Sequence, residues 1–238
     1  NSITTVGVNV TNTPTLSNLN IGVNPNLSGA LNLSNAELGY INIAGNNFAS
    51  IVIGDAVNGT GAITYKPGST INYGSSLTLQ QKVTGAGITL SNSITTSGSQ
   101  TFTGAVILDA ALTLTTSNGA VLFSSTIDNA SATPRALTIS TGSGNVTLTG
   151  IVGGGANGAL DAITINSTGT TAFSAAVTAA SVTTNTGGNA TLGGNVTTTG
   201  AQTYNDAATL GAATTLSASS ITTGSTMAAG SNAIRSEE

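Results

Sequence analysis

The sequence predicts an all-β protein, a right-handed parallel β-helix (β-solenoid) with triangular coils of about 20 residues. Three observations predict this fold. The composition is that of strands and turns, apolar residues alternate with polar ones in many short segments, and one stretch of the chain recurs. A β-sandwich and a disordered chain are the alternatives that the same observations leave open.

The composition favours extended backbone. Thr occurs 43 times, and 39% of the 238 residues are hydrophobic, chiefly Val, Ile, Leu and Ala. Thr, Val and Ile are stiff at χ1 and fit strands, whereas Gly and Asn permit tight turns. Aromatic residues make up only 3%. We therefore expect a narrow core of stacked aliphatic side chains.

The predicted strands are short, and apolar residues alternate with Thr along them. Such a period of two is typical of a strand that is buried on one side, with Thr on the outer face. Segments such as GSGN, TGG and SNG separate the strands. The strand pattern begins at 3–10, and further examples are Ile88–Leu90, Leu112–Leu114, Leu137–Ile139, Val146–Leu148 and Ile163–Ile165. With a coil spacing of about 4.7 Å, roughly a dozen coils would form a rod about 55 Å long.

An internal repeat supports a single continuous solenoid over residues 1–234. Residues 85–114 align without a gap to residues 187–216 at an offset of 102, and 14 of the 30 positions are identical. The matches include Gln100 with Gln202, followed two residues later by Phe102 and Tyr204. At about 20 residues per coil, this offset predicts a displacement of about five coils. Residues 235–238 form a charged C-terminal tail, which we interpret as a frayed terminus.

The composition also excludes several classes of function. The chain has no His and no Cys, so catalytic triads, imidazole ligands, thiolate sites and disulfides are ruled out. Four basic residues and a net charge of −4 cannot form a phosphate-binding stripe, so no nucleic-acid partner is expected. No apolar run approaches the roughly 20 residues of a membrane-spanning helix. We expect no catalytic residues, no metal site and no cofactor.

Three acidic residues are the candidates for a catalytic or metal site: Asp109, Asp128 and Asp55. Asp109 and Asp128 are 19 residues apart, so coils of about 20 residues could stack them as a catalytic pair. Like charges in register repel, however, and Asp is a common turn residue. A lone turn carboxylate such as Asp55 more often bonds the backbone than a metal.

Thr and the aromatic residues offer two possible binding faces. Segments such as Thr113-Leu114-Thr115 would suit ice if Thr were stacked at a constant offset over many coils. Thr instead occurs in differing contexts, with Asn and Ser interrupting the rows, so we interpret it as an outward strand former. The aromatic residues are expected to fill corners of the coil, with a sugar-stacking platform as the alternative.

Residues 31–55 read LNLSNAELGYINIAGNNFASIVIGD. This segment resembles the recurring unit of filamentous-haemagglutinin-type exoproteins of Gram-negative bacteria, in which an LxLxxAEL segment precedes an alternating strand and an xIGD turn. The residues that carry the resemblance are Leu31, Leu33, Ala36, Glu37, Leu38, Ile51, Ile53, Gly54 and Asp55. The resemblance implies a right-handed parallel β-helix, export through an outer-membrane partner, and an adhesive or structural role at the cell surface.

Together these observations predict a non-enzymatic, secreted structural or adhesive solenoid of a bacterial surface fibre, biofilm matrix or large exoprotein. The expected partners are further copies of the chain stacked end to end, neighbouring solenoid segments of a longer rod, or cell-surface and matrix glycans. The alternative is a binding module whose solenoid face recognises glycan or ice. A straight file of Thr or an exposed aromatic row on one face would favour that alternative.

Overall fold

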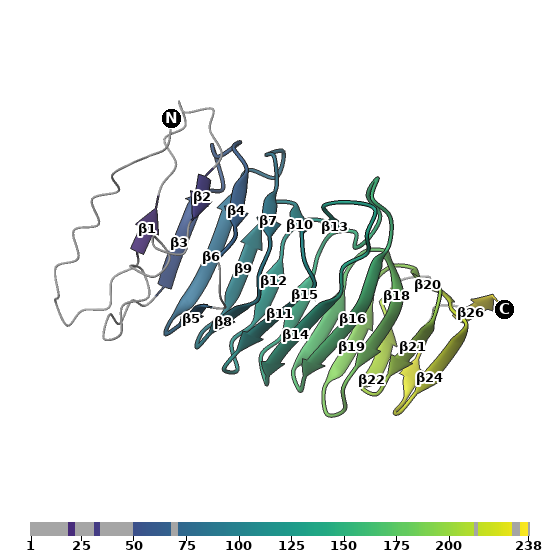
Figure 1. The fold of residues 1–238 in the computed structure, drawn as a ribbon. Helices are drawn as coiled ribbons and strands as arrows, with labels where there is room; N and C mark the ends of the chain where they lie inside the picture. The colour runs from purple at the N-terminus through teal and green to yellow at the C-terminus, as the bar shows by residue number, and fades with distance from the viewer. Residues whose placement is uncertain are drawn as a thin grey trace.

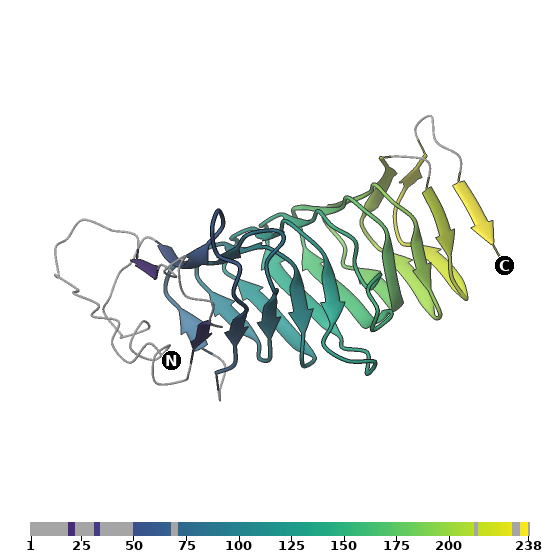
Figure 2. The same ribbon diagram turned by 90° about the horizontal axis from the view of Figure 1, so that it is seen from above.

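The chain winds into a stack of coils in the computed structural model, which describes residues 19–21, 31–33, 50–67, 71–211, 214–229 and 234–237. Figure 1 shows the stack from the side, and Figure 2 shows it from above. There is no helix within these residues, and every strand pairing among them is parallel. About eight turns follow one another at intervals of about 21 residues. The predicted parallel β-helix is confirmed, and the β-sandwich alternative is wrong.

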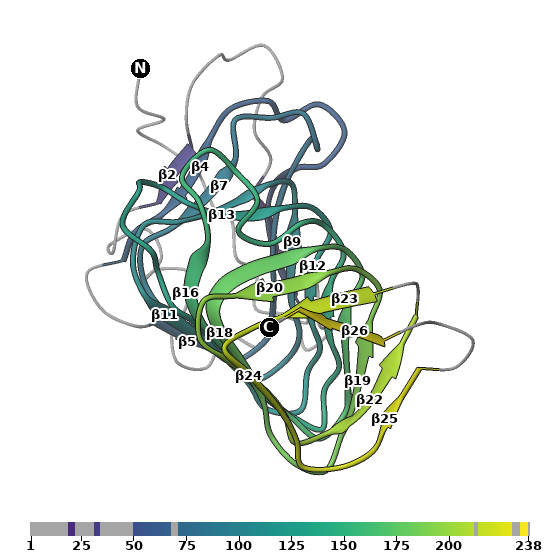
Figure 3. The ribbon, with the colours of Figure 1, turned by 90° about the vertical axis from the view of Figure 1, so that its right-hand side faces the viewer.

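Each coil contributes strands to three faces, which Figure 3 shows in a view along the stack. Face A is a sheet of ten strands. In order along the stack, its strands are β1 (Leu19–Ile21), β3 (Ser50–Asp55), β6 (Ser76–Gln81), β9 (Gln100–Thr103), β12 (Val121–Phe123), β15 (Val146–Leu148), β17 (Thr170–Phe173), β19 (Asn189–Leu192), β22 (Ala207–Leu210) and β25 (Met227–Ala228).

Face B begins with a sheet of five strands and continues beyond it. The five strands are β2 (Leu31–Leu33), β4 (Ile63–Tyr65), β7 (Ile88–Leu90), β10 (Val106–Leu108) and β13 (Ile127–Asn129). Two isolated bridges, from Ile127 to Val152 and from Val152 to Val177, carry the pairing on to the first half of β18 (Val177–Thr184). From there it continues through β20 (Val196–Thr198), β23 (Thr214–Ser217) and β26 (Ile234–Glu237). The parallel pairing therefore extends into residues of the charged tail.

Face C is joined to face B at β18, because this eight-residue strand runs across the corner between them. Its first half pairs with β20 and its second half pairs with β21. Face C consists of β5 (Ile71–Tyr73), β8 (Ile94–Thr96), β11 (Leu112–Thr116), β14 (Leu137–Gly142), β16 (Leu160–Ser167), the second half of β18, β21 (Ala201–Tyr204) and β24 (Ser220–Thr223).

The core is a column of inward side chains from the three faces. Leu137 and Ile139 are fully buried, and Thr138 between them is only half-buried, as the alternation predicts. Vertical neighbours in the column are again apolar, for example Ile139 between Leu114 and Ile165. Burying about 25 cal/mol per Å² of apolar surface in this way is the main force that holds the coils together.

The coils differ in length although their strands stack evenly. Ile51 pairs with Leu77, an offset of 26 residues, whereas Ala190 pairs with Ala208, an offset of 18. The longer coils carry external loops, including 56–62 after β3 and 82–87 after β6. A loop that leaves and rejoins the stack changes the sequence offset without changing the spacing of the strands, because loop length costs little free energy.

Seven of the described Thr residues point inward, contrary to the expectation that Thr lies on the outer face. They are Thr96, Thr116, Thr141, Thr171, Thr184, Thr198 and Thr214. Several of them stabilise a corner. Thr96 Oγ1 donates to Gly98 O at 2.6 Å, and Thr141 Oγ1 donates to Gly144 O at 2.6 Å. Each hydroxyl pairs with a carbonyl of its turn, and the Gly144 carbonyl also accepts a hydrogen bond from Ser167 Oγ at 2.7 Å.

The two copies of the internal repeat share their local structure but lie on different faces. Strands β7, β9 and β10 of the first copy correspond to β19, β21 and β22 of the second. β9 lies on face A, whereas β21 lies on face C; β10 lies on face B, whereas β22 lies on face A. The offset of 102 residues is therefore not the whole number of coils that we expected from the sequence. A strand–corner–strand unit fits any corner, since all three corners join similar short strands.

A buried glutamine marks the repeated corner in both copies. Gln100 Nε2 donates to Ile94 O at 3.1 Å and to Thr115 O at 2.9 Å. In the second copy, Gln202 Nε2 donates to Val196 O at 2.9 Å and to Ser217 O at 3.0 Å. Each side chain links its own coil to the next, and both are fully buried. The identity of Gln100 and Gln202 in the alignment therefore reflects a shared structural role.

Candidate functional site

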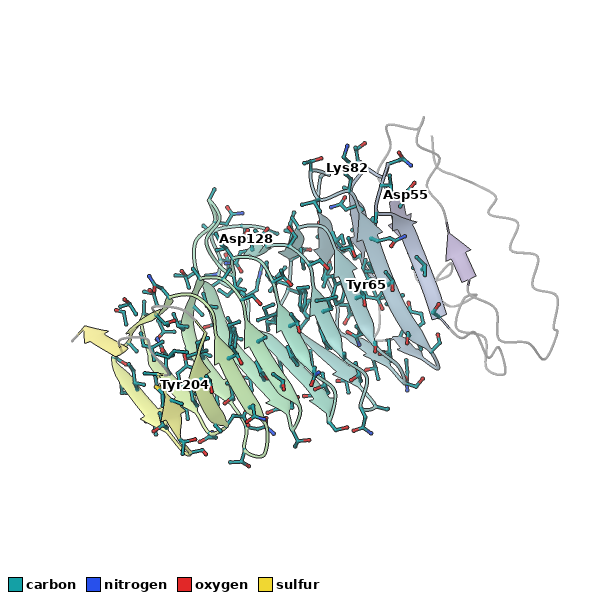
Figure 4. All side chains as sticks on the ribbon, turned by 180° about the vertical axis from the view of Figure 1, so that it is seen from behind. Asp55, Tyr65, Lys82, Asp128 and Tyr204 are labelled. Atoms are coloured by element: carbon teal, nitrogen blue, oxygen red, sulfur yellow. The ribbon has the colours of Figure 1, made fainter. Side chains whose placement is uncertain are left out.

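The charged side chains gather on one side of the solenoid. Apart from the buried Asp206, those that the structure describes lie on face B or at its two flanking corners: Asp55, Lys66, Lys82, Asp109, Asp128, Arg135 and Asp161. Figure 4 shows Asp55, Lys82 and Asp128 along one edge of the molecule. Apart from Asp55 at the end of β3 and Asp161 at the start of β16, where β16 pairs with the first half of β18, the described outward positions of faces A and C carry no charge.

The structure does not bring Asp109 and Asp128 together as a catalytic pair. Asp128 stands opposite Ile107, two residues before Asp109. The local coil is 21 residues long, not 19, so the two carboxylates are out of register. Each has its own partner, because Ser91 Oγ donates to Asp109 Oδ2 at 3.0 Å and Gly155 N donates to Asp128 Oδ1 at 2.7 Å.

The residues that carry the family resemblance are only partly within the described chain. Leu31 and Leu33 begin and end β2, while Ala36, Glu37 and Leu38 lie outside the described residues. Ile51 and Ile53 point inward from β3 and are buried. Gly54 has a φ of 98°, and a Cβ there would collide with the backbone oxygen of Gln80 in the next coil. This combination requires glycine at the turn.

Asp55 stabilises the loop that follows β3. Its Oδ1 accepts hydrogen bonds from Val57 N at 2.8 Å and from Asn58 N at 3.1 Å, and Asn58 Nδ2 donates to Oδ2 at 3.2 Å. The bond from Val57 N, followed by those from Asn58, lowers the pKa of the Asp55 carboxyl. This is the backbone-bonded turn that the sequence favours over a metal ligand at this position.

No group of three or more His, Cys, Asp or Glu side chains that could hold a metal ion occurs in the described part of the chain. Asp206 is the one buried carboxylate there. Its Oδ1 accepts a hydrogen bond from Gly188 N at 2.8 Å, and its Oδ2 has no hydrogen-bond partner. Asp206 therefore links two coils at a corner.

The described aromatic side chains are all buried, so none forms an exposed row. They are Tyr65, Tyr73, Phe102, Phe123, Phe173 and Tyr204. Phe102 and Phe123 stack in successive coils of face A with ring centroids 4.8 Å apart. Figure 4 shows Tyr65 and Tyr204 within the body of the solenoid. Tyr40 and Phe48 lie outside the described residues. The sugar-stacking platform receives no support from the aromatic residues that can be placed.

Tyr65 and Tyr73 are buried phenols, and we expect their ionisation to destabilise the fold at alkaline pH. Burial raises the pKa of Tyr65 to about 12. Burial also raises the pKa of Tyr73, and the neighbouring phenol of Tyr65 raises it further. Each phenol affects the pKa of the other, yet neither hydroxyl makes a hydrogen bond of normal geometry. An unfolded tyrosine ionises near pH 10. Above pH 10 the unfolded chain therefore loses protons that the folded chain retains.

We expect the free energy of unfolding to be unaffected by these tyrosines below pH 10 and to fall as the pH rises from 10 to about 12. Urea unfolding followed by far-ultraviolet circular dichroism at a series of pH values measures this loss. The double variant Tyr65→Phe/Tyr73→Phe should lose less stability over the same interval, because it lacks two of the titrating groups. Identical pH profiles for the two proteins would contradict this assignment.

Face C carries a straight file of outward threonines. The register pairs Thr113 with Thr138, and the pairing then continues from coil to coil. The complete file is Thr113, Thr138, Thr164, Thr183, Thr203 and Thr222. We call these six residues the threonine file. This corrects the expectation that Asn and Ser interrupt every row.

The file could not be recognised from the sequence because its members are unevenly spaced along the chain. Thr138 and Thr164 are 26 residues apart, whereas Thr164 and Thr183 are 19 apart. The difference comes from the loop 153–159, which lies between β15 and β16 and adds residues away from face C. A search for Thr at a constant offset therefore fails even though the side chains are stacked.

A second polar file runs beside the threonine file. It consists of Asn72, Thr95, Thr115, Ser140 and Asn166. The two files are two residues apart on each shared strand, or about 6.6 Å. Face C thus presents two neighbouring columns of uncharged hydroxyl and amide groups.

Comparison of the chain with protein-family models, with curated proteins and with solved structures finds no match. In the described part of the chain, no helix is long and apolar enough to cross a membrane.

Proposed function

We propose that this chain is a non-enzymatic structural or adhesive β-solenoid, secreted to the bacterial cell surface as part of a fibre or large exoprotein. The ladder of parallel strands on three faces is the observation that carries this proposal. It joins every described coil to its neighbours through backbone hydrogen bonds and a continuous apolar column. A force along the stack must break many of these bonds together. The family resemblance of residues 31–55 supports export as the route to the surface.

The last described coil has features that suit stacking on another solenoid. Strands β24, β25 and β26 each pair with one neighbour, so each has an open edge. Open strand edges readily pair with another chain. The core is also less covered here, since Ile221 and Met227 are only partly buried. We propose that a second copy of the chain, or the next segment of a longer rod, covers this end.

Negative-stain electron microscopy of the purified chain tests this proposal. We expect filaments many times longer than one chain, since about eight coils at about 4.8 Å span only about 40 Å. Met227→Lys should abolish filaments, because it places a charge at the open end of the core. Val83→Lys is the matched control, since Val83 is exposed on the loop after β6. Compact monodisperse particles from the unaltered chain would contradict end-to-end stacking.

The threonine file favours a second candidate function, a binding module that uses face C. From the sequence, glycan and ice are the two ligand classes that we expect for such a face. The file supplies the straight row of Thr that a binding face requires, whereas an exposed aromatic row is missing from the described residues.

A further inference from the structure

We infer that face C binds the surface of ice through the threonine file. This inference rests on the second candidate function, that face C is a binding face, and it names the ligand. Three properties of its described residues carry it: the free hydroxyls of the file, the spacing of the coils, and a surface without basic or aromatic side chains.

The hydroxyls of the file are available to a ligand. Among the hydrogen bonds of the described residues, none uses the side chain of a member of the file. Five members are half-buried and Thr222 is exposed, so all six reach the surface. Because Thr is β-branched, its χ1 is restricted. Strands on both sides hold the backbone of every member except Thr222, whose strand β24 pairs with β21 alone. Binding therefore costs little conformational entropy.

The spacing of the file is close to a repeat distance of ordered water. Neighbouring strands of a sheet are about 4.7–4.9 Å apart, which sets the distance between successive Thr residues. In tetrahedrally bonded water, an O···O distance of about 2.75 Å places next-nearest oxygens about 4.5 Å apart. The difference of roughly 0.3 Å per coil accumulates to about 1.5 Å over five intervals, which rotation of the hydroxyls and small side-chain movements can absorb.

The chemistry of the face disfavours other polymeric ligands. Acidic polymers would need a basic surface, but the one charged outward position among the described residues of face C is Asp161, which is acidic. A sugar-stacking platform would need exposed aromatic rings, whereas the described aromatic side chains are buried. A neutral array of small hydroxyl groups suits a ligand that is itself a regular lattice of hydrogen-bond donors and acceptors.

Partition of the purified chain into slowly growing polycrystalline ice is the test, with inhibition of ice recrystallisation as a second measurement. We expect the unaltered chain to enter the ice. Thr164→Tyr and Thr183→Tyr should each reduce uptake by about tenfold or more, because a ring in the middle of the file holds the neighbouring hydroxyls away from a flat surface. Circular dichroism verifies that each variant remains folded.

Thr147→Tyr is the matched control. Thr147 is also an outward, half-buried Thr on a central coil, but it lies on face A between Leu122 and Ala172. Its uptake should stay within about twofold of the unaltered chain, since an exposed substitution elsewhere changes little. Equal losses for Thr147→Tyr and the two file variants would overturn the inference.

Binding of the same proteins to insoluble neutral polysaccharide separates the inference from the function on which it rests. Exclusion of the unaltered chain from ice, with polysaccharide binding that Thr164→Tyr abolishes, would overturn the ice ligand and retain face C as a binding face. Failure to bind either material would overturn both.

Discussion

Replacing Phe123 with alanine is expected to lower the free energy of unfolding by about 3–5 kcal/mol, the usual cost of truncating a buried phenylalanine. Phe123 is fully buried in β12, where it stacks on Phe102 and lies opposite Leu148 in the following coil. Phe102 and Leu148, its neighbours along the column, are held in register by their own paired strands and cannot move in to fill the space. The loss should appear in urea or thermal unfolding followed by circular dichroism.

Leu122→Ala is the matched control for this substitution. Leu122 is the preceding residue of the same strand and points outward, half-buried. Its truncation should cost less than about 1 kcal/mol, as for most partly exposed positions. Because each coil contacts only its neighbours, Phe123→Ala should also weaken the coupling between the two halves of the stack. Equal losses for the two variants would show that the inward column does not dominate stability.

Removing the buried glutamine of the repeated corner is expected to have the next largest effect. Gln202→Leu retains much of the side-chain volume but leaves Val196 O and Ser217 O without the amide donor. A buried polar group that loses its partner costs about 1–3 kcal/mol, so we expect a loss of about 2–4 kcal/mol. Gln100→Leu should cause a loss of similar size, because Ile94 O and Thr115 O lose the equivalent donor.

The two copies of the repeat differ in one contact that sharpens this prediction. Tyr204 donates its hydroxyl hydrogen to Gln202 Oε1 at 3.0 Å, whereas Gln100 Oε1 has no partner beside Phe102. Gln202→Leu should therefore cost about 1 kcal/mol more than Gln100→Leu, since it also removes the partner of a buried hydroxyl. Thr101→Ala, on the outer side of β9, serves as the control and should have little effect. Unfolding in urea measures all of these changes, and an unaffected Gln202→Leu protein would contradict the proposed role.

The sequence predicted much of the fold because strand alternation is a local property. Leu137-Thr138-Ile139 must place two apolar side chains on one side and Thr on the other, whatever the rest of the chain does. The many short strands and their turns then favoured coils over a sandwich. The inward Thr residues were missed for the same reason. A residue such as Thr141 is interpretable only once its corner, and the Gly144 carbonyl that it bonds, are in place.

The internal repeat shows which structural features similar sequence determines and which it does not. Gln100 and Gln202 have equivalent partners in their own coils and in the next, so their shared environment follows from similar sequence. Their positions on face A and face C do not follow from it, because the face depends on the total length of chain that has been wound between them.

The sequence by itself determined the alternation of apolar and polar residues along each short strand and the lack of His and Cys chemistry, and it favoured a parallel β-helix over the alternatives. Only the tertiary structure decided which residues become neighbours across coils. It separated Asp109 from Asp128 and stacked Thr138, Thr164 and Thr183 in one file. The physical reason is that side-chain direction is set within a few residues by backbone geometry, whereas vertical register depends on the length of every intervening loop, which can vary at little cost in free energy.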